Sequence, residues 1–557
     1  MKEAFKVMLT MSLIFCFGLK EAKAVTADNF LETYTLLASD ASDGNVFGAS
    51  VSMNDNLVVA GALEGEKAYI YSFIAGELTE LAIVTEGSHP NSYGSSVSAG
   101  DNTVAVGARN EGSDSQGVTY VYTVTNGSVS SPVTLTANDA QSGDSFGSEV
   151  ALQGNLLLVG APTVDVNSNE NSGAAYVFNL VNGTWQQSAK LVPSDPGENN
   201  YFGISLAISS NGTTIVVGSP GNFENPSETE ITGAVYVFNL VNGTWTQTAK
   251  LVPSNAANDD FFGYDVAIDD GIIAGASPFG NSDTGSVTLF NLPENGTWTQ
   301  GQTLTASDAS AFDLFGYSIA LNEGVLAISA PEDMNTPDSP GAVYLFALQD
   351  STWTQSQDKL VPVAGQISDI FGYSIALDNF ILLVGAPGTS NVGPFQGAVF
   401  FYTQAAVIAD PEELDLDVSA QGTYTLVLNS EPANDVVVTP VNSNFVINPS
   451  SLTFTIANWA TPQTITITAP DTISEADFET FTISHTVTSV DTLFNIDGPE
   501  VLVTVAASGA EPDIRGGRCS LEPQGGKPSH SWMYLLMFVS AFYVSARRQS
   551  LRKGADK

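Results

Sequence analysis

A short motif that recurs along the chain limits the possible folds more than any other feature. It combines an aromatic-Gly step, an alternating run, a short turn and an apolar run that ends in small residues, as in Asp259–Ile268 followed by Ile272–Pro278. The steps lie 46 to 60 residues apart, at Phe47-Gly48, Tyr93-Gly94, Phe146-Gly147, Phe202-Gly203, Phe262-Gly263, Phe315-Gly316 and Phe371-Gly372. A repeat of this length is typical of propellers and solenoids.

Each repeat contains four runs with the character of β-strands. In the third repeat these runs are 147–152, 156–160, 173–178 and 184–191, which alternate and are rich in Val, Phe and Tyr. Asn182-Gly183 separates the last two, and Asn-Gly favours a tight hairpin because both central residues of a type I′ turn need a positive φ. Seven such units predict an all-β fold with a seven-bladed β-propeller.

The two ends of the repeat region predict how the ring closes. The seventh repeat reaches its third strand at 397–402 and then lacks a fourth. Residues 29–38 precede the first aromatic-Gly step and have the character of the missing strand. A blade shared by both ends would remove the exposed sheet edge of an open array, so we expect closure by this N-terminal strand.

These units resemble FG-GAP repeats, the family that forms the propeller of integrin α chains. The resemblance rests on the aromatic-Gly steps together with segments such as Gly160-Ala161-Pro162 and Gly385-Ala386-Pro387, and it covers about residues 29–404. Calcium-binding copies in that family carry an Asp-x-Asp-x-Asp-Gly loop between the two halves of the motif. Here the loop is as short as Gln153-Gly154-Asn155, and calcium needs six or more oxygen ligands, so the family's calcium sites are not expected.

Beyond the repeats, the spacing of shorter alternating runs predicts a β-sandwich over 405–508. The segment around Pro449–Thr455 and Trp459 resembles Calx-beta and immunoglobulin-like modules of bacterial surface proteins, and Trp459 is expected in the core. The expected division of the chain is a signal peptide at 1–24, the propeller at 25–404, the sandwich at 405–508, a linker with a processing motif at 509–531, a transmembrane segment at 532–546 and a basic cytoplasmic tail at 547–557.

Both termini carry export features. A basic start, an apolar stretch and a small-x-small site predict signal cleavage after Ala24. Near the other end, Gly516, Gly517 and Cys519 precede a short apolar run and a basic end, which resembles a Gly-Gly-type C-terminal sorting signal. The run of 15 residues is shorter than the roughly 20 that usually span a membrane. A retained C-terminal anchor is the alternative to processing.

Composition excludes one class of partner. The chain has 17 basic against 60 acidic residues and a net charge of −43. Nucleic-acid binding needs a basic surface, so it is not expected. An acidic surface suits a cation or a basic partner instead. The only cysteines are Cys16 and Cys519, so no disulfide or cysteine-based metal site is expected in the folded region.

Two groups of residues are candidates for a weak calcium site, and calcium is the one candidate cofactor. Oxygen-bearing residues alternate in the third repeat and again in the sandwich, the spacing that a cation site requires. These residues are Asp165, Asn167, Asn169, Asn171, Asp471, Glu475, Asp477 and Glu479. The alternatives are a solvated turn rich in Asp and Asn for the first group and a solvated strand face for the second.

A third group of acidic and amide residues precedes the aromatic-Gly steps. If these residues ring one face, they form an acidic binding surface; otherwise they cap loops and maintain solubility. The group consists of Asp139, Asp144, Asp195, Asn199, Asp259, Asp260, Asp308, Asp313 and Asp369.

No constellation of catalytic residues is evident. The three histidines, His89, His485 and His530, belong to different regions. No nucleophile elbow, phosphate loop or dinucleotide fingerprint occurs, so we expect no enzyme. The resulting hypothesis is an exported bacterial cell-surface adhesion protein that binds a protein or glycan through propeller loops and contacts the membrane through its C-terminal segment before processing. The alternatives are a structural envelope component and, less favoured, a secreted hydrolase.

Overall fold

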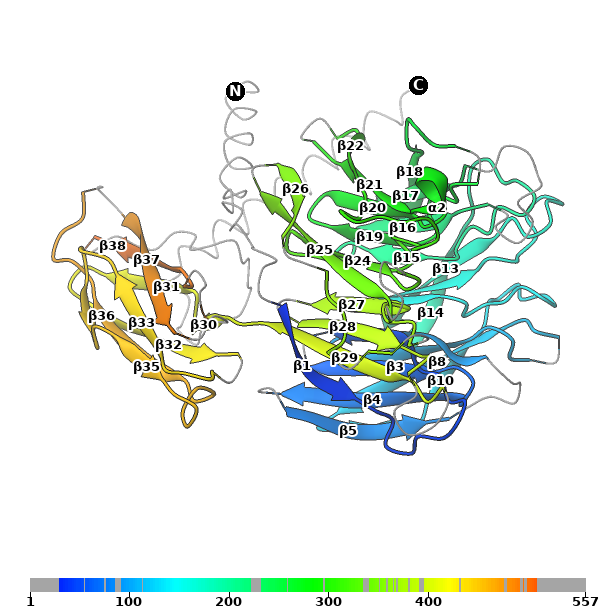
Figure 1. The fold of residues 1–557 in the computed structure, drawn as a ribbon. Helices are drawn as coiled ribbons and strands as arrows, with labels where there is room; N and C mark the ends of the chain where they lie inside the picture. The colour runs from blue at the N-terminus through cyan, green and yellow to red at the C-terminus, as the bar shows by residue number, and fades with distance from the viewer. Residues whose placement is uncertain are drawn as a thin grey trace, which may run out of the picture. The chain divides into compact units, whose positions relative to one another are not determined.

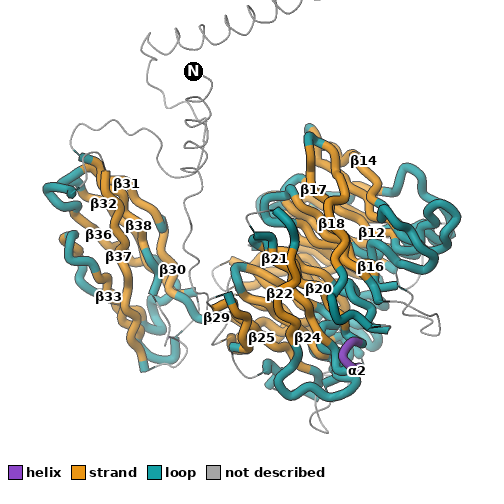
Figure 2. Tube along the Cα trace, turned by 90° about the horizontal axis from the view of Figure 1, so that it is seen from above, coloured by secondary structure: helices purple, strands orange, loops and turns teal. Residues whose placement is uncertain are grey.

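Strands make up almost all of the regular structure in the computed structural model of this protein. The single helix among the described residues is the short α2 (Gly280–Asp283), drawn in purple in Figure 2. The structure describes residues 30–507 except for 55, 75–76, 86–91, 113, 222–231, 258, 294–295, 334–339, 350, 357–358, 364, 367–368, 379–380, 390–394, 430–431, 475–477, 491–493 and 495–497.

The first six repeats each form one antiparallel sheet whose strands follow one another along the chain. They are numbered here as sheets one to six. Sheet one is β2 (Phe47–Asn54), β3 (Leu57–Ala62), β4 (Lys67–Ile74) and β5 (Glu77–Val84). Sheet two is β6 (Tyr93–Ala99), β7 (Thr103–Ala108), β8 (Val118–Thr125) and β10 (Val133–Leu135), with β9 (Ser128–Val129) also paired to β8. Sheet three is β11 (Val150–Gln153), β12 (Leu156–Ala161), β13 (Ala174–Val181) and β14 (Thr184–Leu191).

Sheets four to six keep the same order. Sheet four is β15 (Leu206–Ile208), β16 (Thr214–Ser219), β17 (Ala234–Val241) and β18 (Thr244–Leu251). Sheet five is β19 (Val266–Asp269), β20 (Ile272–Ser277), β21 (Ser286–Asn291) and β22 (Thr299–Leu304). Sheet six is β23 (Ile319–Asn322), β24 (Val325–Ala330), β25 (Ala342–Gln349) and β26 (Thr352–Gln355).

The seventh sheet joins the two ends of the repeat region. It contains β27 (Ser374–Asp378), β28 (Ile381–Ala386) and β29 (Ala398–Gln404), and its fourth strand is β1 (Phe30–Leu36). β1 pairs antiparallel with β29, from Phe30 opposite Gln404 to Leu36 opposite Val399. Figure 1 shows the dark blue β1 beside the yellow-green β29. This pairing supplies the fourth strand that the last repeat lacks.

Burial along each sheet explains the sequence pattern of its strands. All six residues of β12, Leu-Leu-Leu-Val-Gly-Ala, are buried, because both faces of a second strand pack against neighbouring sheets. The fourth strand β14 instead alternates between exposed and partly buried residues. The apolar runs of the sequence are therefore the second strands of their sheets, and the alternating Trp-containing runs are the fourth strands, at the edge of the sheet.

The hydrophobic cores lie between successive sheets. One core joins β11–β14 with sheet four through residues such as Leu158, Phe202 and Val217. Another joins the seventh sheet with the first through residues such as Leu383, Phe401 and Phe47. The first strand of each sheet also contacts that of the next, and β27 contacts β2. The all-β architecture of repeated four-stranded sheets is consistent with a β-propeller.

The repeated glycines lie where backbones of neighbouring sheets touch. A Cβ on Gly173, whose φ is +88°, would lie 2.1 Å from the carbonyl oxygen of Phe202 in the next sheet. Similarly, a Cβ on Gly160 would lie 2.1 Å from the carbonyl oxygen of Gly203. Only glycine permits such an approach. Phe202 is fully buried, and its ring meets that of Tyr236 edge-on at 5.4 Å.

Two boundaries differ by three residues from the expected strands of the third repeat, one of them the end of β13, which continues to Val181 instead of stopping at 178. We expected the first strand to begin at Gly147, but β11 begins at Val150. The intervening residues include a tight turn, in which Ser148 N donates to Ser145 O, and Gly147 N donates to Gly160 O of the adjacent β12. In the third repeat the aromatic-Gly step therefore belongs to the connection between sheets, whereas in the first two repeats it opens the strand, at Phe47 of β2 and Tyr93 of β6.

Residues 407–506 form two further sheets. One is β30 (Val407–Asp410), β32 (Gln421–Leu428), β36 (Gln463–Thr468) and β34 (Val446–Asn448). The other is β31 (Glu413–Asp417), β38 (Val501–Ala506), β37 (Phe478–Ser489), β33 (Val436–Val441) and β35 (Leu452–Phe454). Both sheets contribute to one core, against which the partly buried Trp459 packs.

The expected signal peptide, processing motif and C-terminal segment at 532–546 lie outside the described residues, as do Ala24, Gly516, Gly517 and Cys519. Within the described part of the chain, no helix combines the length and apolar character needed to cross a membrane.

Candidate functional site

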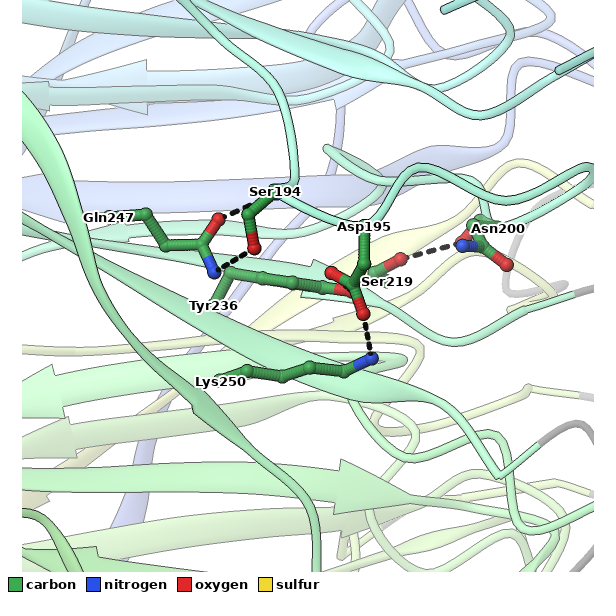
Figure 3. A network of polar contacts seen from close by, with 7 residues as sticks. All are labelled: Ser194, Asp195, Asn200, Ser219, Tyr236, Gln247 and Lys250. Carbon is green, nitrogen blue, oxygen red and sulfur yellow. Dashed lines mark hydrogen bonds and ion pairs between the residues drawn. The ribbon is translucent and has the colours of Figure 1, made fainter.

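The acidic residues before the aromatic-Gly steps hold the connections between sheets. Figure 3 shows the connection between sheets three and four, where Asp195 lies beside Lys250 and Tyr236. Lys250 Nζ lies 2.6 Å from Asp195 Oδ2, and Tyr236 OH donates to Asp195 Oδ1 at 3.0 Å. The same ammonium group lies 5.3 Å from the centre of the Tyr236 ring. The arrangement ties the end of one sheet to the third and fourth strands of the next.

The Asp–Tyr–Lys arrangement recurs at three other connections. Its acidic members are Asp40, Asp139 and Asp308, which pair with Lys67, Lys190 and Lys359 in the following sheet. In sheet six, the buried Asp333 also contacts Lys359, and Tyr344 OH donates to both acids. In sheet one, Lys67 comes from the third strand instead of the fourth. These pairs use all four lysines between residues 30 and 507.

Charge and burial act together on these groups. Partial burial raises the pKa of Asp195, but its hydrogen bonds to Lys250 and Tyr236 outweigh this and lower the pKa overall. Burial, followed by the charge and hydrogen bond of Asp195, raises the pKa of Tyr236. Asp195 is therefore ionised and Tyr236 neutral at physiological pH.

The fifth repeat replaces the whole arrangement at once. Asn255 stands where four of the other repeats have Asp, and Thr288 and Thr303 occupy the positions that Tyr236 and Lys250 have in the fourth repeat. The two threonine hydroxyls share a hydrogen bond of 3.0 Å. The joint replacement indicates that the three side chains of each connection act as a unit.

A glutamine from the fourth strand adds a second attachment to the same connections. Gln187, Gln247 and Gln300 each accept a hydrogen bond, at 2.7–2.9 Å, from the backbone N of Asn138, Ser194 and Ser254. In each case the donor directly precedes the Asp or Asn of the connection. The connections are thus fixed at two adjacent residues.

A second set of acids from the predicted group caps local turns. Asp144, Asp260, Asp313 and Asp369 each accept, at 2.6–2.8 Å, from the backbone N three residues earlier. Burial raises the pKa of Asp144, Asp260 and Asp369. The sequence left two interpretations of this acidic group, a binding surface and the capping of loops. These four residues cap loops. Two other members of the group lie in the same kind of segment. Asn199 accepts a hydrogen bond from Asn171 Nδ2 at 3.0 Å. Asp259, in the connection between sheets four and five, has a φ of +67°.

The candidate calcium residues of the third repeat belong to a tight turn and its neighbours. Val166 and Asn169 exchange two backbone hydrogen bonds around Asn167 and Ser168, whose φ angles are +52° and +70°. Asp165 Oδ1 accepts from Asn171 N at 3.0 Å, and Asn169 Nδ2 donates to Pro196 O at 2.9 Å. These contacts give Asp165, Asn169 and Asn171 structural partners.

The candidate residues of the sandwich are only partly described. Asp471 accepts from Ser419 Oγ at 2.7 Å, and Glu479 accepts from Ser474 N at 2.6 Å. Glu475 and Asp477 lie outside the described residues. Across the part of the chain that the structure describes, no group of three or more His, Cys, Asp or Glu side chains could hold a metal ion.

A further set of mostly polar residues lies in or just before the first strands, which contact one another from sheet to sheet. The two residues that follow each aromatic-Gly step are together called the inner ring. They are Ala49, Ser50, Ser95, Ser96, Ser148, Glu149, Ile204, Ser205, Tyr264, Asp265, Tyr317, Ser318, Tyr373 and Ser374. The second of the two positions is Ser in five repeats but Glu149 in the third and Asp265 in the fifth. Both acids are half-buried by exposed area.

Asp265 joins three consecutive sheets. Its Oδ1 accepts from Ser205 Oγ at 2.7 Å and from Val266 N at 2.8 Å, and its Oδ2 accepts from Ile319 N at 2.8 Å. Ser318 adds a further side-chain hydrogen bond. Burial raises the pKa of Asp265 to about 6, although all these hydrogen bonds favour the ionised form.

Glu149 has far fewer partners. Burial and, after it, the charge of Asp265 raise the pKa of Glu149 to about 8. Ser96 provides the one side-chain hydrogen bond that opposes this shift. Glu149 is therefore mostly protonated at neutral pH, whereas Asp265 is mostly ionised.

Three tyrosines continue the inner ring beside Asp265. Tyr317 lies between Tyr264 and Tyr373, with ring centres 5.4 and 5.2 Å away. Phe279 meets Tyr264 edge-on at 6.1 Å. Burial, as the largest cause, raises the pKa of Tyr264 to about 12, so its hydroxyl stays protonated under physiological conditions.

Sequence reasoning missed the inner ring, although the signal is present. Alignment of the seven repeats on their aromatic-Gly steps shows two acids at a serine position and three tyrosines in consecutive repeats. The same alignment reveals Lys-Leu-Val-Pro at 190–193, 250–253 and 359–362. The recurrent residues predict the strands, whereas the inner ring is marked by the positions at which the repeats differ.

The FG-GAP repeat family model matches residues 30–71, 130–178, 185–238, 245–290, 298–346 and 353–402, together more than half of the chain. No curated protein matches the sequence.

Several solved structures are distantly similar. A putative 6-phosphogluconolactonase from Bacteroides uniformis ATCC 8492 has a TM-score of 0.42 and 16% identity, over 60% of this chain and 91% of its own. The periplasmic gluconolactonase PpgL of Pseudomonas aeruginosa has a TM-score of 0.39 and 13% identity, over 57% and 86%. An exo-β-1,3-galactanase from Phanerochaete chrysosporium has a TM-score of 0.27 and 10% identity, over 58% and 92%. None of these similarities is close enough to transfer an activity.

Proposed function

Because the chain belongs to the FG-GAP repeat family, we propose that it is an exported bacterial cell-surface protein that binds a protein or glycan through the loops of its repeats. In this proposal the seven repeat sheets form a closed seven-bladed propeller, and residues 405–508 form a β-sandwich that carries it. The signal peptide, the Gly-Gly-type processing motif and the short C-terminal segment belong to the same proposal.

The variation among loops at one end of the sheets carries the proposal. In a four-stranded antiparallel sheet, the loop between the second and third strands lies at the same end as the connection to the next sheet. This loop runs over 63–66 in the first sheet, over 162–173 in the third, and over 278–285, which includes α2, in the fifth. The hairpins at the opposite end are short and alike, as at 154–155 and 270–271. Binding residues concentrate on variable loops held by a rigid scaffold.

The connections beside these loops supply the rigidity. Asp195 and Ser194 are each held by a side chain of sheet four, so the backbone on that side of the loop has a fixed position. Preorganised loops lose less conformational entropy on binding than free ones. The framework residues repeat, while the loop residues differ, which is the pattern expected of a recognition surface.

Charge narrows the class of partner. The four lysines of residues 30–507 are paired with aspartates, which leaves Arg109 as the one remaining basic residue of that region apart from His89 and His485. Most of the acids have no basic partner available. Electrostatic steering therefore favours a basic protein surface or a ligand that binds together with a cation such as calcium.

One observation favours a second candidate, a hydrolase. Two carboxyl groups of the inner ring, Glu149 and Asp265, have pKa values of about 8 and about 6, and such a pair suits an acid and a base. Against this, Asp265 accepts hydrogen bonds from two backbone N–H groups and two serines. A carboxylate saturated in this way has little capacity left to act as a base. Binding remains the better-supported function.

A binding screen with a loop replacement tests the proposal. The full-length protein is applied to glycan and extracellular-matrix protein arrays, with and without calcium. Residues 162–173 are then replaced by the short loop 63–66, while Asn182→Asp at the opposite end serves as control. Loss of the captured partner only with the loop replacement is expected. Equal binding by both variants, or turnover of glycosides that is lost in Glu149→Gln, would contradict the proposal.

A further inference from the structure

The tyrosines and the underused carboxyl of the inner ring lie away from the loops considered above. Tyr264, Tyr317 and Tyr373 come from the first strands or adjoining turns of sheets five, six and seven, and they form a continuous row of rings. Each is half-buried, so solvent reaches part of its surface. The row begins next to Asp265, which accepts a hydrogen bond from Ser205 of the fourth repeat at 2.7 Å. The first strands β19, β15 and β11 contact one another in turn, and Glu149 directly precedes β11.

The inner ring contains acids but no bases. None of its positions is Lys, Arg or His; the titratable groups are Glu149, Asp265 and the three tyrosines. Protein surrounds both carboxyls closely enough that burial is the main cause of their raised pKa values. A positive charge that entered this environment would meet two carboxyl groups and no like charge.

The two carboxyls differ in what they can offer a ligand. A carboxylate has about four acceptor sites. Asp265 uses its sites on Ser205, Val266, Ile319 and Ser318. Glu149 has one side-chain partner among the described residues, Ser96. Its remaining capacity is available to a donor that is not part of the described chain.

Tyrosine faces attract cations through the negative potential above the ring, and the attraction is largest for cations that are weakly hydrated, such as quaternary ammonium groups. A metal cation fits less well, because it requires a larger set of oxygen ligands than two carboxyls and a serine provide. We propose that the inner ring binds an organic cation of the alkylammonium class, with Tyr264, Tyr317 and Tyr373 as its aromatic contacts and Glu149 as its counter-ion.

Binding of this kind has a proton linkage. The cation stabilises ionised Glu149, so binding at neutral pH releases a proton from that residue, and affinity rises as pH approaches 9. Asp265, already ionised at neutral pH, contributes charge without releasing a proton. Tyr264 and Tyr317 remain neutral throughout, because burial, as the largest cause, raises their pKa values.

Calorimetric titration of the full-length protein with tetramethylammonium chloride tests the proposal, with sodium chloride as reference. Affinity is measured at pH 7 and pH 9, and in two pH 7 buffers of different ionisation enthalpy to count released protons. We expect Tyr317→Leu and Glu149→Gln to weaken binding about tenfold, and Tyr317→Phe, which keeps the ring, to stay within about twofold of the native protein.

Two exposed residues on other strands provide controls. Tyr34→Leu in β1 and Glu77→Gln in β5 remove the same chemical groups outside the inner ring and should leave affinity unchanged. Melting temperatures identify any variant that has lost its fold. If one has, the affinity of Tyr317→Phe and the number of protons released by the native protein still test the proposal. No saturable binding of tetramethylammonium, affinity unaffected by Glu149→Gln, or binding of calcium alone would overturn the proposal. The outcome is independent of the loop-replacement experiment.

Discussion

The Nζ atom of Lys250 lies 2.6 Å from Oδ2 of Asp195, although 55 positions separate the two residues in the chain. The pair links the end of sheet three to the outer strand of sheet four. Equivalent pairs link three other neighbouring sheets, so long-range order in this protein depends on a repeated local contact.

The partly exposed Asp195–Lys250 pair should contribute a modest coupling energy. The side chains are 50% and 40% exposed, so solvent screens their attraction. In a double-mutant cycle with Asp195→Asn and Lys250→Met, we expect a coupling of about 0.5–1 kcal/mol in urea unfolding. A coupling near zero would show that the ion pair itself does not stabilise this connection.

Lys359→Met should cost considerably more than Lys250→Met. Lys359 contacts Asp308 and also Asp333, whose side chain is fully buried. Removing the ammonium group leaves a buried carboxylate with less compensation, and we expect a loss of about 2–4 kcal/mol. Urea unfolding of both variants measures the difference, and the additional substitution Asp333→Asn should recover part of it. Equal costs for the two lysine variants would contradict this account.

Gly173→Ala should be among the most damaging single substitutions in the repeats. The new Cβ would lie 2.1 Å from Phe202 O and 2.4 Å from Phe202 N, both backbone atoms of the next sheet. We expect a loss of about 3 kcal/mol or more, or failure to fold. Gly183→Ala is the matched control, because its φ is also positive but no atom lies within 4 Å of the new Cβ. That variant should lose only about 1 kcal/mol, and a similar loss in both would exclude backbone contact as the cause.

Glu149→Gln should change how stability depends on pH. Because folding raises the pKa of Glu149 from an ordinary 4.5 to about 8, its contribution is fully present below pH 4.5 and is lost as pH rises through 8. Glutamine cannot ionise, so the variant should be more stable than the native protein at pH 9, on the order of 2–4 kcal/mol, and close to it at pH 5. Thermal unfolding across this range provides the measurement, with Glu77→Gln as a control that should follow the native curve.

His485 should make the sandwich sensitive to acid. Its Nε2 lies 2.8 Å from Tyr424 OH, its Nδ1 lies 2.6 Å from Pro499 O, and the side chain is buried. Burial lowers the pKa of His485 despite the Pro499 hydrogen bond, so its contribution is present above pH 6.5 and is lost as pH falls through the folded-state pKa. Tyr424→Phe should cost about 1–2 kcal/mol at pH 7. Titration of the His485 ring by NMR would contradict this if its pKa were 6.5 or higher.

The repeat architecture could be predicted because it depends on backbone geometry that few residues permit. Residues equivalent to Phe202-Gly203 and Gly160 recur along the chain. The aromatic side chain fills the core between two sheets, and glycine alone allows the two backbones to come into contact. The Asp195–Lys250–Tyr236 arrangement could not be derived in the same way. Its members lie on three segments whose proximity follows only from the order in which sheets pack. Glu149 and Asp265 escaped notice for a related reason: an acid in a strand predicts an exposed position unless neighbouring sheets are known to enclose it.

The pairing of every lysine in the repeats has a consequence for survival outside a cell. Trypsin-like proteases need an extended segment with an accessible Lys or Arg, and between residues 30 and 507 the chain offers four lysines and Arg109. Lys67, Lys190 and Lys250 lie within β-strands, and all four lysines have their ammonium groups engaged by carboxylates. Cleavage at these sites requires local unfolding of a sheet. The residues that hold the repeats together therefore also protect four of the five possible cleavage sites of this region, and the exposed Arg109, which lies in a turn, is the fifth.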